Sequence, residues 1–360
     1  MSFLCGLVGL PGVGKTCLFN ALAAVHAAAD GRGESHRAVV AVPDPRIAPL
    51  AAMYNAPKTV PARMELVDVP GLKAGSTADG GRGNRLLAHV KDVDALIHVV
   101  RCFEDPAVPH EYPTIDPRRD VETLDLELVV ADAQTLQNKL DRLAKKSRTG
   151  DAEARRELAA CEGVKAALDE GVPVRKQNPD ERARQAIREC NLVSAKPVLY
   201  AANLKTPADA RGSPHAKTLE ALARAEGAEC VTACARDEAE IAQLSPEDQE
   251  IFRADLGLVD SSTDRVVRAA YRTLGLVNFL TAGPKEVHVW TCPAGSKAPA
   301  AAGKIHTDME RGFIRMEVMT FDDLMAAGSE AAVAKAGKLR VEGREYVVRD
   351  GDIVVVRFNR

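Results

Sequence analysis

The stretch Gly9-Leu10-Pro11-Gly12-Val13-Gly14-Lys15-Thr16 decides the fold of this chain, because its spacing is that of a Walker A motif. Residues 3–8 form an apolar run that predicts a buried strand before it, and residues 17–29 predict a helix after it. In this order of parts, inward-facing N–H groups and the helix dipole hold phosphate, Lys15 reaches the β/γ-phosphates, and the Thr16 hydroxyl binds Mg²⁺. The stretch therefore predicts a nucleoside triphosphate site in an α/β fold.

A second motif, Asp68-Val69-Pro70-Gly71, follows residues 63–67, which predict a core strand. An aspartate at the end of a strand beside the phosphate loop can hold the Mg²⁺ shell, and the N–H of Gly71 can contact the γ-phosphate. An ordinary turn at the end of a strand is the alternative interpretation. The position of the motif downstream of a Walker A sequence favours phosphate sensing.

The composition is that of a globular protein, with 46% hydrophobic and 28% charged residues and a formal net charge of -3. This near-neutral balance argues against a nucleic-acid surface spread over the whole molecule and leaves room for a local basic face. The eight cysteines are scattered without a C-x-x-C pair, so we expect no zinc site, no disulfide framework and a reducing compartment. No apolar run reaches membrane-spanning length and the first strand begins almost at once, so we expect no membrane segment, no signal or transit peptide and a cytoplasmic location.

A helical hairpin is predicted in the middle of the chain. Asp116 and Pro117 suit the N-cap and the first position of a long helix, and apolar residues recur at helical spacing from Val121 onward. After a polar break, residues 152–170 predict a second helix with a matching stripe. We expect the two stripes to pack against each other; a peptide-binding groove is the alternative.

From residue 277 the pattern changes to short strands separated by turns, typical of a small β-grasp-like module. The expected strands are residues 286–292, 313–319, 344–348 and 353–358, with Asp350-Gly351 as a hairpin turn. Basic residues here form either an RNA-facing surface or an ordinary solvated face; they are Arg311, Lys338, Arg340 and Arg344.

Residues 197–203 predict another core strand, which ends in Asn203 where a base-recognition motif is expected. GTPases continue such an asparagine with Lys-x-Asp, and the carboxylate binds the N1–H and 2-amino groups of guanine. Here the continuation is Leu204-Lys205-Thr206, so a buried guanine would leave its donors unpaired at a cost of about 1–3 kcal/mol. ATP is therefore the expected nucleotide and GTP the alternative. After the next predicted strand, Cys234 and Ala235 are expected to form the second base loop.

Several stretches together resemble the YchF-type Obg-like ATPases, which belong to the translation-factor class of P-loop NTPases. They are Pro43-Asp-Pro-Arg46, Val67-Asp-Val-Pro-Gly-Leu72, Gly83-Asn84, residues 93–105, Lys196-Pro-Val-Leu-Tyr200, Phe279-Leu-Thr-Ala282, His306-Thr-Asp308, Gly312-Phe-Ile-Arg315 and Asp350-Gly-Asp352. The resemblance covers essentially the whole chain. It implies an α/β fold whose OBG-type P-loop domain takes residues 1–115 and 196–276, with an inserted coiled-coil hairpin at 116–195 and a TGS domain at 277–360.

The resemblance also implies a function. We expect an Mg²⁺-dependent, ATP-binding and slowly hydrolysing switch protein associated with ribosomes, in translation or stress regulation. It implies the ribosome or a ribosomal subunit as partner, an RNA contact through the TGS domain or the helical arm, and a monomer. A GTPase of the same class and a non-hydrolysing nucleotide-gated adaptor remain alternatives.

The chain departs from the family pattern at the positions that assist hydrolysis. Leu72 stands where Ras-like enzymes have a water-orienting glutamine, Thr77 where eukaryotic relatives have a switch-loop histidine, and Arg32 at the switch-one threonine. Gly12 replaces the P-loop asparagine of the family, and Thr206 departs from its usual glutamate. We therefore expect intrinsic turnover well below ~1 s⁻¹, and no catalytic residue is assigned.

The sequence thus predicts a nucleotide site and a metal site. The expected nucleotide-binding residues are Gly9, Pro11, Gly12, Val13, Gly14, Lys15, Thr16, Cys17, Gly71, Asn203, Leu204, Cys234 and Ala235. The expected Mg²⁺ ligands are Thr16 and Asp68. His98 lies within the apolar run of residues 94–102 and is interpreted as a core histidine rather than a catalytic one.

Overall fold

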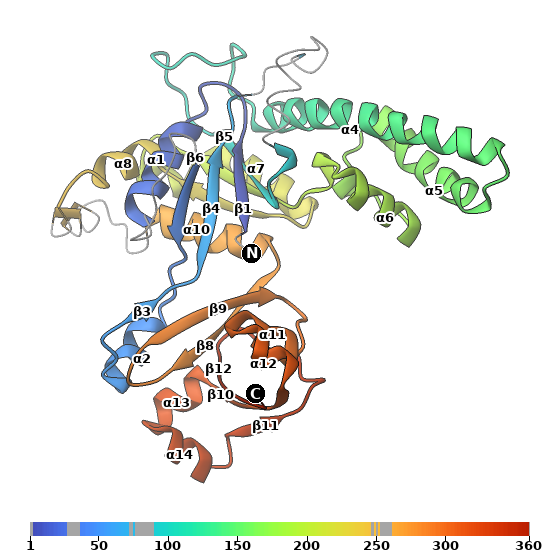
Figure 1. Ribbon diagram of the computed structural model, residues 1–360. Helices are drawn as coiled ribbons and strands as arrows, with labels where there is room; N and C mark the ends of the chain where they lie inside the picture. The colour runs from blue at the N-terminus through green and yellow to red at the C-terminus, as the bar shows by residue number, and fades with distance from the viewer. Residues whose placement is uncertain are drawn as a thin grey trace. The chain divides into compact units, whose positions relative to one another are not determined.

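The computed structural model of the 360-residue chain describes residues 3–26, 37–71, 75, 90–245, 248–249, 251–252 and 261–359. The chain forms two compact units, each assembled from two separate parts of the sequence. The first consists of Met1–Val40 and Glu65–Thr273, and the second of Ala41–Met64 and Leu274–Arg360. Figure 1 labels the elements of both units.

A six-stranded sheet forms the centre of the first unit, in the order β2-β4-β1-β5-β6-β7 (Figure 1). Its strands are β1 (Leu4–Val8), β2 (Arg37–Ala41), β4 (Arg63–Asp68), β5 (Ala95–Arg101), β6 (Val198–Asn203) and β7 (Glu229–Ala233). The pairings from β4 through β7 are parallel, and every residue of β1, β5 and β6 is buried. Such continuous burial requires packing against both faces of the sheet.

Helices supply this packing. α1 (Lys15–His26) packs against α8 (Ala235–Ile241) and α10 (Ser262–Thr273), whereas α7 (Pro214–Ala225) packs against α4 (Pro117–Arg148). α4 and α7 share one hydrophobic core with alternate residues of the strands. The expected mostly parallel α/β core is confirmed.

The predicted hairpin is an arm built from α4, α5 (Ala152–Asp169) and α6 (Glu181–Cys190), with α4 and α5 side by side in Figure 1. Asp116 caps α4 as expected, because its carboxylate accepts from two backbone N–H groups of the first turn. The first part of the α4 stripe packs on the sheet and the second part packs on α5 and α6, so the stripe is covered within the chain. Although α4 has 32 residues, neither it nor any other helix in the described part is apolar enough to cross a membrane.

The second unit is built on a mixed sheet in the order β11-β10-β12-β8-β9-β3. Its strands are β3 (Thr59–Val60), β8 (Leu276–Ala282), β9 (Val287–Pro293), β10 (Phe313–Thr320), β11 (Arg340–Glu342) and β12 (Asp352–Phe358). Its helices are α2 (Ile47–Tyr54), α11 (Ala298–Ile305), α12 (Thr307–Arg311), α13 (Phe321–Ala327) and α14 (Glu330–Lys335). α11 packs on β9 and β10 and closes a core around Phe279 and Met316. The TGS assignment of this unit stays a prediction.

Residues 41–64 belong to the second unit, although the sequence analysis assigned all of residues 1–115 to the nucleotide domain. Strand β3 runs parallel to β9, and α2 packs against β8 and β9. Arg46 binds Asp44 at 2.7 Å and Asp350 at 2.8 Å, and thereby joins the two parts of the unit. The reason for the difference is that the partners of this segment lie at the far end of the sequence.

Two expectations for the C-terminal module are wrong. Residues 344–348 do not form a strand; the backbone of Tyr346 and Val348 pairs with residues 296–298 instead. Asp350-Gly351 is not a hairpin turn, because the Asp350 carboxylate accepts from Asn278 N at 2.9 Å and β12 pairs with β10 and β8.

Candidate functional site

The residues predicted to bind phosphate follow β1 directly and form the turn into α1. Lys15 is the first residue of α1, is 6% exposed, and donates from Nζ to the Leu10 carbonyl at 2.7 Å. Gly14 has a φ of +96°, and a Cβ on it would lie 2.3 Å from Asn203 Nδ2, so only glycine fits. The loop is therefore closed around its lysine, with Asn203 packed against it.

Asp68 and Gly71 lie beside this loop, as the D-x-x-G spacing predicts. Strand β4 pairs with β1 in a register that places Asp68 opposite Leu7. The Thr16 hydroxyl donates to Asp68 Oδ2 at 2.7 Å, whereas Asp68 Oδ1 is buried and has no hydrogen-bond partner in the described part of the chain. A Cβ on Gly71 would lie 3.2 Å from Lys15 Nζ. The structure thus brings these four predicted residues together at one edge of the sheet.

The electrostatics of the loop favour an anionic ligand. Burial lowers the pKa of Lys15 to about 8, and the Asp68 carboxylate opposes this shift. The buried ammonium group has lost much of its hydration. Phosphate oxygens would replace the lost water with charge-assisted hydrogen bonds.

Asn203 links the phosphate loop to both predicted base loops. Its Nδ2 donates to Val13 O at 2.8 Å, and its Oδ1 accepts from Ala235 N at 3.1 Å. Leu204 N in turn donates to Ala233 O at 2.8 Å. Because Asn203 is 4% exposed, these bonds are shielded from water and hold the three loops in register.

Two cysteines lie at this junction. The Cys17 thiol donates to the Ala235 carbonyl at 3.2 Å, and Cys234 is buried at the start of the second base loop. Burial raises the pKa of Cys234 to about 12 and also raises the pKa of Cys17. Both side chains therefore remain thiols at neutral pH and serve as small neutral groups.

A segment that the sequence analysis did not connect to the site covers the phosphate loop. Gly12 has a φ of +73°, and a Cβ on it would lie 2.4 Å from the carbonyl oxygen of Pro109. The segment is held by the buried Arg101, whose guanidinium donates to three backbone carbonyls of residues 103–108 at 2.9–3.0 Å. Asp105 forms an ion pair with Lys205 at 3.3 Å and so reaches the first base loop. The sequence feature that could have predicted this segment is Arg101, a charged residue at the end of the apolar strand β5.

Some predicted positions cannot be placed. Arg32, Leu72, Thr77 and the pair Gly83-Asn84 lie outside the described residues. His98 is described: it is 2% exposed within β5, and burial lowers its pKa to about 3. A neutral histidine enclosed by the sheet agrees with the core interpretation.

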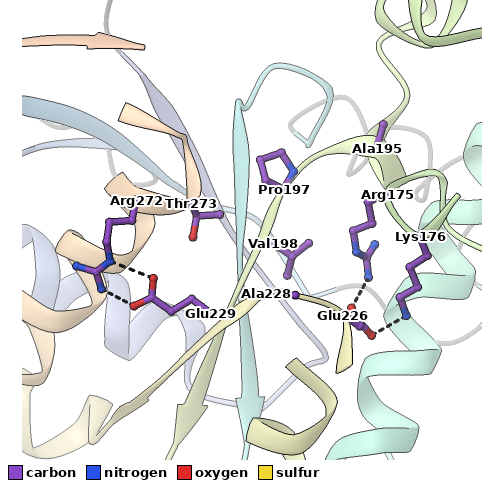
Figure 2. Close-up of a pocket in the computed structure, with 11 residues that line it drawn as sticks. Arg175, Lys176, Ala195, Pro197, Val198, Glu226, Ala228, Glu229, Arg272 and Thr273 are labelled. Carbon is purple, nitrogen blue, oxygen red and sulfur yellow. Dashed lines mark hydrogen bonds and ion pairs between the residues drawn. The ribbon is translucent and has the colours of Figure 1, made fainter. Parts of the chain in front are cut away.

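A cavity of ≈ 520 Å³ lies at the amino ends of β6 and β7, the opposite edge of the sheet from the phosphate loop. Figure 2 shows the side chains that line it. Its charged side chains pair with one another: Lys176 binds Glu226 at 2.7 Å, and Arg272 binds Glu229. Arg175 is held by Asp125 at 2.6 Å. The pair Lys176–Glu226 joins the base of the arm to the end of α7, and the pair Arg272–Glu229 joins α10 to β7. We therefore interpret the cavity as a structural junction and not as the nucleotide site.

Comparisons with known proteins bear on both units. Residues 4–149 match a family model described as "50S ribosome-binding GTPase". Residues 276–359 match the YchF-GTPase C-terminal family, described as "Protein of unknown function (DUF933)". The chain is 39% identical to the ribosome-binding ATPase YchF of Bacillus subtilis and 41% identical to that of Haemophilus ducreyi, over 100% of each chain. The chain belongs to the YchF family.

Further YchF relatives agree. Obg-like ATPase 1 of Oryza sativa is 38% identical over 98% of this chain and 91% of its own length. The solved structure of the Schizosaccharomyces pombe YchF GTPase matches with a TM-score of 0.86 and 31% identity, over 99% of this chain and 98% of that one. The expected resemblance and the expected P-loop fold class are thereby confirmed, together with a YchF-type nucleotide hydrolase.

Proposed function

We propose that this YchF-family chain binds ATP through the phosphate loop and the two base loops, hydrolyses it slowly, and acts as a switch on the ribosome. The observation that carries the proposal is the convergence of Lys15, Thr16, Asp68 and Gly71 on one edge of the sheet. The names of the relatives, ribosome-binding ATPases, support the nucleotide and the partner. A cytoplasmic monomer is part of the same proposal.

Mg²⁺ is the cofactor that suits these residues. The Thr16 hydroxyl and the Asp68 carboxylate offer hard oxygen ligands, and the buried Asp68 Oδ1 has no other partner among the described residues. Mg²⁺ usually takes one or two protein ligands and completes its shell with water and phosphate oxygens. When bound, the ion neutralises charge on the β- and γ-phosphates.

The residues of the chain then have separate roles. Lys15 binds the β- and γ-phosphates, and the N–H of Gly71 bonds the γ-phosphate in the triphosphate state. Loss of the γ-phosphate removes that bond. The N–H of Gly75, four residues after Gly71 in the sequence, donates to Glu127 Oε1 at 2.5 Å, and Glu127 lies on α4. The proposed switch therefore has a direct hydrogen bond to the arm.

Single-turnover cleavage of labelled ATP, with and without ribosomes, tests the function. Because Leu72 cannot orient water, we expect a rate well below ~1 s⁻¹ for the protein alone and an acceleration by ribosomes. A rate near 1 s⁻¹ without a partner would contradict slow turnover. ATP binding without cleavage under either condition would favour the nucleotide-gated adaptor.

We further propose that ribosomal RNA contacts a basic groove on the arm. This arm groove is a cavity of ≈ 580 Å³ lined by four basic and two acidic side chains: Lys91, Lys139, Arg142, Lys146, Glu157 and Glu189. Lys139 pairs with both carboxylates at 2.6–2.7 Å, whereas the other three cations form no ion pair with any residue that the structure describes. Unpaired cations in a groove suit a phosphate backbone.

The alternative RNA surface, in the C-terminal module, has less charge to offer. Lys338 pairs with Asp323 at 2.6 Å, and Arg340 pairs with Glu342 at 3.0 Å. The guanidinium of Arg344 donates to the Phe313 carbonyl at 3.1 Å. Three of the four basic residues considered there are therefore already engaged, which favours the arm groove.

A further inference from the structure

Residues 103–114, named here the covering segment, run from the end of β5 to the start of α4 and are attached at both ends. At the first end, the Arg101 guanidinium donates to three backbone carbonyls of residues 103–108. At the second end, the segment contacts the first two turns of α4. The Pro109 carbonyl, which packs against Gly12 of the phosphate loop, falls between these two anchors.

His110 provides the buried part of the second anchor. Its Nε2 lies 3.0 Å from Oδ2 of Asp120 on α4, and the two side chains are 4% and 2% exposed. Its Nδ1 accepts from the N–H of Tyr112 at 3.2 Å, which leaves the ring proton on Nε2, the nitrogen that faces Asp120. Neither Nε2 nor Asp120 Oδ2 has another partner in the described part of the chain. The two groups therefore depend on each other.

Further contacts complete the second anchor. The Tyr112 hydroxyl lies 3.1 Å from Thr123 Oγ1, and the guanidinium of Arg119 lies over the Tyr112 ring, 4.1 Å from its centre. Arg119 also donates to the Thr114 carbonyl at 2.6 Å and to Asp120 Oδ1 at 3.1 Å. The Asp120 carboxylate therefore keeps one cation when the imidazole is replaced, so we expect such a variant to fold.

A cavity of ≈ 600 Å³ lies along the covering segment. The residues that line it all belong to the stretch 101–115, so the segment is not filled from beneath by another element. The ion pair of Asp105 with Lys205 links the segment to the first base loop, but this lysine side chain is 52% exposed, and exposed pairs contribute little. The position of the Pro109 carbonyl is therefore set mainly by the two anchors.

We propose that His110 is a positioning residue of the nucleotide site. Its pair with Asp120 holds the Pro109 carbonyl against Gly12, so the first helix of the arm keeps the phosphate loop in its binding conformation. This inference rests on the proposed nucleotide site and assigns a residue that keeps the site preorganised. When the covering segment is released, the loop is in its binding conformation for only a fraction of the time, and the apparent affinity falls by that fraction.

Two substitutions separate the two nitrogens of His110. His110→Asn keeps an acceptor for the N–H of Tyr112 and loses the group that reaches Asp120, whereas His110→Gln keeps an N–H for Asp120 and loses that acceptor. Titration with fluorescent ATP and ADP in the presence of Mg²⁺ measures the result. For His110→Asn both affinities should fall about tenfold, the lower end of the range for a hydrogen bond to a charged group. For His110→Gln they should change less than about threefold.

A double-mutant cycle with Asp120→Ala shows whether His110 acts through this carboxylate. Asp120→Ala should also weaken nucleotide binding about tenfold, and combining it with His110→Asn should weaken binding no further, because both changes remove the same interaction. A purely structural role of the ring would give additive losses and no rescue by glutamine. Thermal unfolding establishes that each variant is folded, and Asp120→Ala alone tests the same pair should His110→Asn fail to fold.

Affinities of His110→Asn and Asp120→Ala equal to those of the parent would overturn the proposal, as would equal losses for His110→Asn and His110→Gln. Failure of the parent protein to bind either nucleotide would instead refute the proposed function.

Discussion

Lys15 shows at the residue scale how the site is prepared before any ligand arrives. Its ammonium is buried against the Leu10 carbonyl, with Asp68 close enough to influence its pKa. Asp68 Oδ1 is likewise buried without a partner among the described residues. Both groups carry a desolvation cost in the free protein that Mg²⁺ and phosphate can relieve. Burial of these two groups therefore lowers the stability of the free protein and raises its affinity for Mg²⁺ and phosphate.

We predict that Lys15→Ala abolishes binding of both ATP and GTP, because no other cation occupies that position in the described phosphate loop. Fluorescence titration with labelled nucleotides measures the affinities. Thermal unfolding of the same variant is the control, and its midpoint should not fall, since the mutation removes a poorly solvated charge. Retained micromolar binding by the variant would contradict the role given to Lys15.

His98 yields a prediction on pH. Its pKa is lowered to about 3 by burial, whereas a histidine in an unfolded chain has a pKa of about 6.5. At a pH between these two pKa values, His98 binds a proton in the unfolded chain but not in the folded protein. The free energy of unfolding should therefore fall by about 1.4 kcal/mol per pH unit as the pH drops below about 6.5. From there to pH 5 the loss is about 2 kcal/mol.

Urea unfolding of the parent and of His98→Gln at pH 7 and pH 5 measures this contribution. Glutamine takes up no proton, so the variant should lose about 2 kcal/mol less between the two pH values. The same loss in both proteins would mean that other groups, and not His98, set the acid sensitivity.

At the scale of elements, α4 belongs to two structures at once. Its first half packs on the nucleotide sheet and its second half on α5 and α6. Glu127, in the first half, accepts the N–H of Gly75. A single helix therefore connects the residue that bonds Gly75 to the tip of the arm.

Ion pairs of Arg175 and Lys176 hold the base of this arm, and Figure 2 shows both side chains. Arg175 has a side chain 10% exposed and binds Asp125 of α4 at 2.6 Å, so Arg175→Met leaves this buried carboxylate with Lys176, at 3.1 Å, as its remaining cation. We predict a destabilisation of about 1.5–3 kcal/mol. The control Arg188→Met removes an exposed pair with Glu181 on the same arm and should cost at most about 1 kcal/mol. Chemical denaturation measures both, and similar losses would contradict the importance of burial.

The arm groove yields a prediction on RNA. Replacing Lys91, Arg142 and Lys146 with alanine should weaken ribosome co-sedimentation and reduce the salt dependence of binding by about one unit of slope per lost phosphate contact. ATP affinity should not change. The control replaces Arg155 and Arg156 of α5, which do not line the groove. A loss shared by the control would point to the overall charge of the arm instead.

Local patterns in the sequence predicted most of the elements and the phosphate-binding residues. Asp116 and Lys15 interact with residues close to them in the sequence, and Asp68 lies on a parallel strand next to the one that precedes the phosphate loop. Other features depend on partners that no spacing rule connects. Arg46 and Asp350 are 304 positions apart, and Pro109 covers Gly12 from a loop without a motif.

At the scale of the whole molecule, the two units share one chain that passes from the first to the second and back near its beginning. β2 leads into residues 41–64 and β4 leads out of them. The second unit therefore does not coincide with the C-terminal family match at residues 276–359. It also needs α2, whose Leu50 is fully buried.

We predict that a chain of residues 277–360 alone does not unfold cooperatively. It lacks the Lys58 carbonyl that pairs with Val287 N and the burial of Leu50, worth about 1.5–3 kcal/mol. Joining residues 41–64 to 274–360 through a flexible linker should restore a cooperative thermal transition, measured by circular dichroism. Cooperative unfolding of 277–360 by itself would contradict this dependence.

Because residues 41–64 belong to the second unit, the two parts of this unit are synthesised at different times. α2 and β3 are made long before β8, β9 and Asp350, their partners in the second unit. At translation rates of about 5–20 residues per second, the interval lasts on the order of ten to fifty seconds. Throughout that time the apolar side of α2 has no native surface to cover it.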